Sequence, residues 1–247
     1  MAASRSCWSK LAITIAIVAI FFGVFTYLDS IKHNWYVFDQ NKLNEIAVKN
    51  LARNLTREQL LEAIINDLAA EYVLVIAITF NLIRYPGHIN VEQEWMLNVA
   101  GGAMGTFAKY STTFLIYQGA MTILHSSVTE YIIFFGTPIG TEGFTGRFLA
   151  DDYFTILEGE QWAFPPGSLD REVYRPGDMH HLPRGAGKGY RMPDRCWALE
   201  YARGWIPAMF PFGFADGIFS TLDFHSLWQI VKVSVPLMTK ELLQGKI

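Results

Sequence analysis

Residues 196–204 read CWALEYARG, a stretch typical of an extended strand that carries one acid in its middle. Side chains of a strand point alternately to opposite faces, so Glu200 shares its face with small side chains, Cys196, Ala198 and Ala202. A carboxylate is costly to bury without a partner or a proton, and small neighbours leave open space above it. We interpret Glu200 as a candidate site residue, the alternative being a structural acid paired with Arg203 or another base.

Further short strands are predicted around this one, from residue 129 onward. Runs rich in β-branched and aromatic residues are broken by glycine and proline: TEYIIFFG at 129–136, TEGFTGRF at 141–148, EVYRPGD at 172–178 and PRGAGKGY at 183–190. Strands and turns at this spacing predict a small barrel or sandwich. We expect this β-barrel to span residues 121–204, and it contains a second acidic site, the pair Asp151 and Asp152.

The composition favours a protein that contacts a membrane. Of the 247 residues, 51% are hydrophobic and 15% aromatic, which is high for a purely soluble domain. The net charge of −3 leaves no basic surface, so nucleic acid is not an expected partner. The two cysteines, Cys7 and Cys196, have neither a disulfide-framework nor a zinc spacing, and we expect no metal.

A membrane anchor is expected at residues 11–28, which follow a tail at 1–10. The segment LAITIAIVAIFFGVFTYL contains no charge and is about long enough to cross a bilayer core. A cleavable signal peptide is the alternative, but the segment ends in Thr26-Tyr27-Leu28 instead of the small residues that cleavage requires. Arg5 and Lys10 precede the segment, which favours a cytoplasmic N-terminus.

Helices are predicted on both sides of the barrel, at 29–120 and 205–247. Thr56 and Gln59 fit a capping box that starts a helix, and Asp223 is placed to start another. Residues 205–219 are apolar but interrupted by proline and glycine, which favours a segment lying on a membrane. An apolar stripe then follows at helical spacing, facing either an interface or a core: Phe224, Leu227, Trp228, Val231 and Val235.

Several separated motifs, in order along the chain, resemble one known family. They are NVAGGAMG at 98–105, HSSVTEY at 125–131, FGT at 135–137, ADDYFTIL at 150–157, LEYARGWIP at 199–207 and FSTLD at 219–223. Together they are similar to the family of fungal C-8 sterol isomerases, whose animal relative is the sigma-1 receptor. Relative to that family, segments 73–85 and 106–120 look like insertions.

The resemblance implies a fold, a location and a reaction. It implies an α+β protein with an N-terminal transmembrane helix, a cupin-like β-barrel with flanking helices, and C-terminal amphipathic helices that lie against the membrane. It also implies a single-pass protein of the endoplasmic reticulum membrane that contacts membrane lipid and forms a homo-oligomer, a trimer in the relative. The family shifts a sterol double bond from Δ8 to Δ7, as in fecosterol to episterol during ergosterol synthesis, without a cofactor.

Moving an alkene requires one group that donates a proton and one that removes a proton, which two carboxyls can supply. By the resemblance, Glu200 matches the family's ligand-binding glutamate and Tyr131 its hydrogen-bonded tyrosine. For the second carboxyl we favour Asp152 over Asp151, because Asp152 shares a strand face with Phe154, the position of the family's second acid. The remaining expected sterol contacts are Trp95, Ile133, Phe135, Phe148, Tyr153, Phe154 and Met192.

Two alternatives to this function stay open from the sequence. His180 and His181 are reminiscent of cupin metal ligands, although the rest of that ligand pattern is missing. A non-catalytic receptor that binds cationic amphiphiles and sterols would use the same buried carboxylate, because a protonated amine resembles a carbocation in charge and apolar shape.

Overall fold

The computed structural model describes residues 2–79, 87–97, 119–219 and 221–247. The chain divides into two compact units, Met1–Tyr36 and Val37–Ile247. Helices and strands both contribute to the second unit, so the predicted mixed architecture is confirmed. Segments 80–86 and 98–118, which include part of the first expected insertion and most of the second, lie outside the described residues.

The first unit consists of helix α1 (Ala2–Ile31) and the short η1 (Lys32–Trp35). Within it, Ala12–Trp35 has a mean hydropathy of 2.1 and is long and apolar enough to cross a membrane. The hydroxyls of Thr14 and Thr26 donate to the carbonyls of Lys10 and Phe22, at 3.0 and 2.7 Å. These polar groups are therefore satisfied within the helix, as an apolar surrounding requires.

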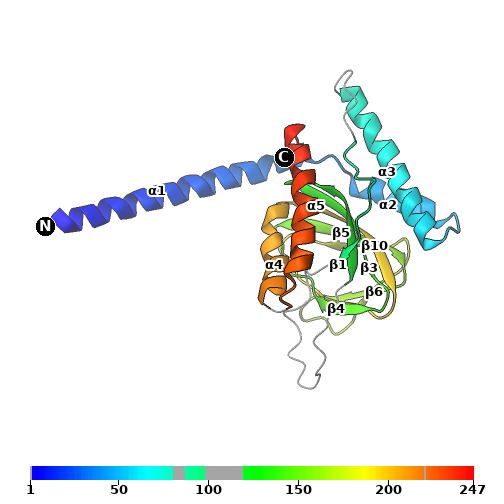
Figure 1. Ribbon diagram of the computed structural model, residues 1–247. Coiled ribbons are helices and arrows are strands. Elements are labelled where there is room, and N and C mark those ends of the chain that lie inside the picture. Colours follow the sequence, from blue (N-terminus) through cyan, green and yellow to red (C-terminus); the bar gives the residue numbers. More distant parts are fainter. Residues whose placement is uncertain (1, 80–86, 98–118, 220) are drawn as a thin grey trace. The chain divides into compact units, whose positions relative to one another are not determined.

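Among the described residues of the second unit, ten strands form two antiparallel sheets (Figure 1). The larger sheet has the order β1-β2-β3-β10-β5-β8, with bounds Met96–Leu97, Ala120–Ser126, Glu130–Thr137, Cys196–Gly204, Ala150–Glu158 and Met179–Leu182. The smaller has the order β4-β9-β6-β7, with bounds Thr141–Phe144, Gly189–Met192, Gln161–Phe164 and Glu172–Tyr174. Two of these strands, β1 and β2, begin before residue 121, where the barrel was expected to start.

Strand β10 is the stretch CWALEYARG, and it lies in the middle of the larger sheet between β3 and β5. Its two faces belong to two different cores. Leu199 and Tyr201 join the core on one face, whereas Cys196 and Ala198 join the core on the opposite face. The alternation predicted from the sequence is therefore confirmed over this strand.

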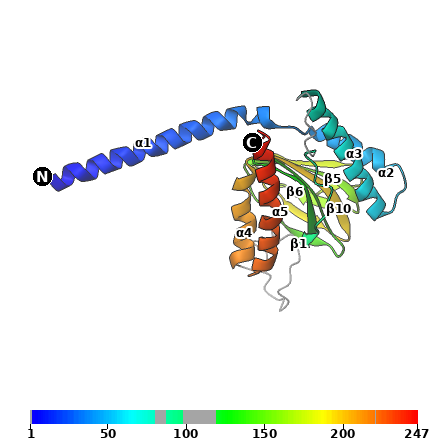
Figure 2. The ribbon, with the colours of Figure 1, turned by 45° about the horizontal axis from the view of Figure 1, so that its top comes forward.

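Helices α2 (Gln40–Leu51) and α3 (Arg57–Thr79) cover the first of these faces (Figure 2). The predicted capping box is confirmed: the Thr56 N–H donates to Gln59 Oε1 at 3.1 Å, and the Gln59 N–H reaches Thr56 Oγ1 at 3.4 Å. Residues 73–79 continue α3, so this part of the first expected insertion is helical.

A buried carboxylate on β3 joins three distant parts of this core. Glu130 accepts hydrogen bonds from the backbone N–H groups of Val37 and Phe38, at 2.8 and 3.2 Å. The hydroxyl of Tyr201 lies 2.6 Å from the same carboxylate, and the ammonium of Lys246 forms an ion pair with it. Glu130 thereby connects the start of the unit, the central strand and the C-terminus.

On the other side lie η3 (Ile206–Ala208), α4 (Phe210–Phe219) and α5 (Phe224–Leu243), as Figure 2 shows. Asp223 caps α5 as predicted, accepting from the Ser226 N–H at 3.0 Å. The buried face of α5 comprises Ser226, Leu227, Ile230, Ser234, Met238 and Glu241.

The apolar stripe predicted for α5 is therefore not its main buried face. Phe224, Trp228 and Val235 of that stripe are exposed, although Leu227 is buried. At 100° per residue the stripe lies beside the buried face, so the helix carries two adjacent apolar surfaces. The buried surface includes two small residues, Ser226 and Ser234.

Candidate active site

A cavity lies between the two sheets and is closed on one side by the C-terminal helices. The side chains that line it are mostly apolar: Met121, Ile123, Ser126, Tyr131, Ile133, Phe135, Thr145, Phe148, Asp152, Phe154, Gln161, His180, Leu182, Tyr190, Glu200, Ile206, Met209, Phe210, Phe214, Ile230 and Ser234. Two carboxyl groups, Asp152 and Glu200, are among them. An apolar cavity with a few convergent polar groups is the usual form of a small-molecule site.

Glu200 enters the cavity from β10 and is hydrogen-bonded by Tyr131 of the neighbouring strand β3. The register pairs Glu200 with Ile133 and with Phe154, so apolar side chains stand on both sides of it. Arg203 points to the other face of the sheet and donates to Gln40 and Tyr153. The sequence alternative of a Glu200–Arg203 ion pair is therefore not what the structure has.

Asp152 reaches the same cavity from β5. It stands opposite Ala202 of β10, which places it diagonally across from Glu200, where side chains remain within reach of each other. Both carboxyl side chains are buried, and Oδ1 of Asp152 has no hydrogen-bond partner within the part of the chain that is described. The small Ala202 leaves space between Asp152 and Tyr131 on the flanking strands.

Burial favours the protonated form of both acids. It raises the pKa of Glu200 from 4.5 to about 7, against the opposing effect of the hydrogen bond from Tyr131. It also raises the pKa of Asp152 well above 3.8, and the nearby charge of Glu200 adds to this shift. Two close carboxyls in an apolar cavity do not both ionise readily, so the pair retains a proton near neutral pH.

A buried histidine, His180, also lines the cavity. His180 on β8 holds Gln161 through its Nδ1 at 2.9 Å, and Lys188 lies 3.2 Å from its Nε2. Burial, followed by the charge of Lys188, lowers the pKa of His180 to about 4. His181 points to the opposite face, where it lies 3.3 Å from Asp151 and stacks on Tyr153. The two histidines therefore do not converge on one metal ion.

Most side chains expected from the sequence to meet the substrate do line the cavity. The structure brings together Tyr131, Ile133, Phe135, Phe148, Asp152, Phe154 and Glu200. It does not bring Asp151, Tyr153, Trp95 or Met192 to the lining. Asp151 accepts from the Arg184 N–H outside the cavity, and Tyr153 belongs to the helix-covered core. Trp95 is 40% exposed and packs edge-on against Trp197, and Met192 is buried behind the lining.

Sequence reasoning missed the contribution of the C-terminal helices to this cavity. Ile206, Phe210 and Phe214 recur at every fourth position, as do Ile230 and Ser234, and this spacing is the signal that marks one helical face. Gln161 and His180 were also missed as cavity residues. They come from different sheets, and nothing in the sequence pairs them.

Together, the two sheets enclose an apolar cavity that contains two buried carboxyls, Asp152 and Glu200. The model of the family described as ERG2 and Sigma1 receptor like protein matches residues 15–111 and 116–246. The chain belongs to this family.

Known relatives agree with that membership. The chain is 47% identical over 215 residues to a C-8 sterol isomerase of Pyricularia oryzae, with 86% of each chain covered. It is 35% identical over 160 residues to the sigma non-opioid intracellular receptor 1 of Danio rerio, covering 64% of this chain and 66% of that one. An RmlC-like cupin from Shewanella frigidimarina matches 40% of this chain and 89% of its own, with 17% identity and a TM-score of 0.33.

Proposed function

We propose that this protein is a C-8 sterol isomerase, which moves the Δ8 double bond of a sterol to Δ7 in ergosterol synthesis. The observation that carries the proposal is the pair Asp152 and Glu200, two buried carboxyls in an apolar cavity. Family membership supports it, because fungal members similar over most of this chain are named C-8 sterol isomerase.

The first step requires a proton donor inside an apolar cavity. One carboxyl of the pair gives its proton to C9 of the C8–C9 double bond, and the electron pair of that bond forms the new C–H bond. A tertiary carbocation remains at C8. The raised pKa values of Asp152 and Glu200 support this role, because an acid that retains its proton near neutral pH is available to donate it.

The second step requires a base beside the first acid. The other carboxyl, as carboxylate, removes a proton from C7, and the C–H electrons form the C7–C8 double bond. Proton gain and loss balance, and no carbon is oxidised or reduced overall, so the reaction needs no redox cofactor. The hydrogen bond from Tyr131 supports the ionised form of Glu200 in this exchange.

The remaining lining suits the carbocation between the two steps. Phe135 and Phe154, whose ring centres lie 6.5 Å apart, present aromatic rings within the cavity. Aromatic faces stabilise a cation without supplying a nucleophile that would capture it. His180 stays neutral in this environment and adds no competing positive charge.

The location belongs to the proposal as well. We place the protein in the endoplasmic reticulum membrane, anchored by α1, with α4 and α5 against the lipid. The apolar length of Ala12–Trp35 and the exposed Phe219, Phe224 and Trp228 support contact with lipid. A homotrimer rests on the resemblance to the sigma-1 receptor, and cross-linking in intact microsomes would test it.

The decisive experiment is sterol analysis of cells that lack their own Δ8–Δ7 isomerase and express this chain. Restored Δ7 sterols, lost in Glu200→Gln and in Asp152→Asn, are the expected result. Asp151→Asn is the matched control, because Asp151 is the neighbouring acid on the same strand and points away from the cavity.

Persistent Δ8 sterols despite well-folded, membrane-inserted protein would overturn the enzymatic proposal. If that same protein bound cationic amphiphiles in a manner that depends on Glu200, the sigma-receptor type of function would stand in its place. The match to the receptor of Danio rerio makes this the specific competitor.

A further inference from the structure

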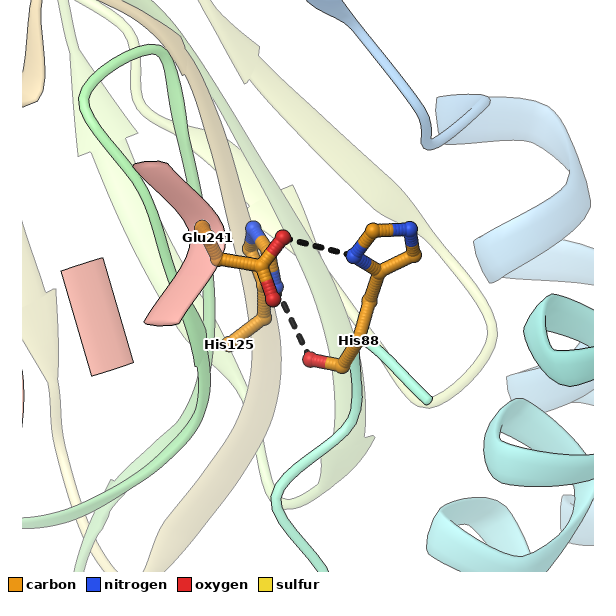
Figure 3. Close-up of side chains that lie close together, drawn as sticks. All are labelled: His88, His125 and Glu241. Carbon is orange, nitrogen blue, oxygen red and sulfur yellow. Dashed lines mark hydrogen bonds and ion pairs between the residues drawn. The ribbon is translucent and has the colours of Figure 1, made fainter. Parts of the chain in front are cut away.

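Three buried side chains outside the cavity meet at one point, and they come from three separate parts of the chain (Figure 3). His88 precedes β1, His125 lies on β2, and Glu241 lies near the end of α5. They are 9%, 1% and 2% exposed, respectively. One nitrogen or oxygen atom of each lies within 4.8 Å of the others.

A β-bulge in β2 places His125 in this cluster. The register between β2 and β3 pairs Ile123 with Ile133 and then His125 with Ile132, so it shifts between Ile123 and His125. Without the shift, His125 would share the cavity face with Ile123. A bulge of this kind re-aims a side chain, and here it turns the imidazole away from the cavity.

The hydrogen bonds of His125 leave one of its nitrogens ready to act as a ligand. Its Nδ1 lies 2.9 Å from the carbonyl oxygen of His88, and a carbonyl only accepts, so Nδ1 carries the hydrogen. Nε2 of the neutral ring then holds a lone pair. This atom is buried and has no hydrogen-bond partner among the described residues. Metal-ligating histidines commonly donate their other N–H to a backbone carbonyl in this way.

The other two side chains of the cluster, His88 and Glu241, already face each other. Nδ1 of His88 lies 2.6 Å from Oε2 of Glu241, and Figure 3 shows the carboxylate facing the His88 ring. The nearby ammonium groups are engaged elsewhere: Lys240 donates to the Gly87 carbonyl, and Lys246 pairs with Glu130. The positive charge of a metal ion would thus be balanced in part by Glu241.

We propose that His88, His125 and Glu241 form a binding site for a divalent transition-metal ion, with Zn²⁺ the preferred occupant. Two imidazole nitrogens and one carboxylate oxygen are a known zinc ligand set, with bonds of about 2.0–2.2 Å and a fourth position for water. On binding, the ion replaces the hydrogen between His88 and Glu241, and these two atoms separate by several tenths of an ångström.

The site would connect metal binding to the stability of the barrel. Glu241 belongs to α5, and Ile230 and Ser234 of the same helix line the cavity. An ion held by α5, β2 and the segment before β1 fixes the end of α5 to the sheet. An ion that binds the folded protein alone raises its stability with concentration. This role is separate from the proton transfers assigned to Asp152 and Glu200.

The test uses the full chain, purified in detergent and stripped with a chelator. Cobalt chloride is added as the spectroscopic probe and zinc chloride as the stabilising ion. We expect the d–d absorption of tetrahedral Co²⁺ at one equivalent, its loss on addition of zinc, and a thermal midpoint that rises with zinc concentration.

Glu241→Gln keeps the shape of the side chain and the hydrogen bond to His88, and His125→Gln removes the imidazole ligand. Both variants are expected to lose the cobalt spectrum, whereas His181→Gln and His225→Gln, which alter exposed histidines, retain it. Folding of each variant is checked by its unfolding transition without metal. A folded wild-type protein that binds no more cobalt than Glu241→Gln, or a spectrum lost only in His181→Gln, would overturn the proposal.

Discussion

Two buried glutamates on neighbouring strands of the same sheet have opposite surroundings. Glu130 on β3 faces the helix-covered core, where two backbone N–H groups, the hydroxyl of Tyr201 and the ammonium of Lys246 surround it. Glu200 on β10 faces the cavity, where Tyr131 is the hydrogen-bond donor that the described residues supply. A carboxylate with its acceptor positions filled holds the structure together, whereas one left with few donors keeps a proton to exchange.

The largest expected effect is a loss of sterol turnover when a carboxyl of the cavity is removed. Glu200→Gln and Asp152→Asn should each lower sterol turnover by roughly 10²–10⁴-fold, the usual contribution of a general acid or base. The unfolding midpoint should not fall, because each change removes a carboxyl that is costly to bury. Turnover is measured in microsomes by sterol analysis, alongside thermal unfolding. Activity that survives in both variants would contradict the mechanism.

For Glu130→Gln we expect the opposite result, a loss of stability without a loss of activity. Removing the charge leaves the Lys246 ammonium buried without its counter-ion, which should lower the free energy of unfolding by about 3–5 kcal/mol. The molecules that remain folded should turn over sterol at the normal rate, because Glu130 does not line the cavity. Stability is measured by denaturant unfolding, and turnover is measured as activity per folded molecule. A stable but inactive Glu130→Gln variant would contradict the structural role assigned to Glu130.

The pH dependence should follow the raised pKa of Glu200. Its pKa is about 7 in the folded protein and 4.5 as the ordinary value, so the folded state holds a proton that the unfolded chain releases. The stability from this group is fully present below about pH 4.5 and is lost as pH rises through 7. Turnover should fall only at higher pH, where the remaining proton of the pair is also lost, because one carboxyl must stay protonated to act as the donor.

Two controls sharpen this pH measurement. Glu200→Gln should flatten the decrease in stability between pH 4.5 and 7 relative to the wild type. Asp151→Asn should leave both pH profiles unchanged, because Asp151 lies outside the cavity. An activity that rises steadily from pH 6 to 9 would show that no protonated carboxyl is required.

The smallest effects come from a matched pair of tyrosine variants. Tyr131→Phe removes the hydroxyl that lowers the pKa of Glu200, so the acidic limb of activity, over which Glu200 ionises, should move to higher pH with little change in stability. Tyr201→Phe removes a donor from Glu130 and should cost about 1–3 kcal/mol of stability with the pH profile intact. If both variants changed stability and the pH profile to the same extent, Glu200 and Glu130 would not have the distinct roles assigned to them.

Alternation along strands explains how much of the site could be predicted from the sequence. It placed Glu200 beside small residues, and it favoured Asp152 over Asp151 as the acid that lies with Phe154; both sit in the cavity. The same rule places Tyr153 on the opposite face, in the core, so naming it as a sterol contact disregarded the pattern.

Other features depend on tertiary packing that no local pattern records. The bulge that turns His125 breaks the period of two, and the residues around it give no turn signal. The C-terminal helix carries two adjacent apolar surfaces, and sequence alone does not tell which one meets the barrel. Trp95 and Met192 are apolar, but Trp95 packs against Trp197 and Met192 is buried in the core, and neither lines the cavity.

Because β10 lies in the middle of the larger sheet, a change in its length would disturb both of its faces. Successive residues of this strand alternate between the helix-covered core and the cavity. Loss of one residue upstream of Glu200, with the flanking pairs unchanged, would move the carboxyl into the core and the bulky Tyr201 into the cavity. A single-codon deletion there would abolish stability and chemistry together, so we expect β10 to tolerate exchanges of residue type far better than changes in length.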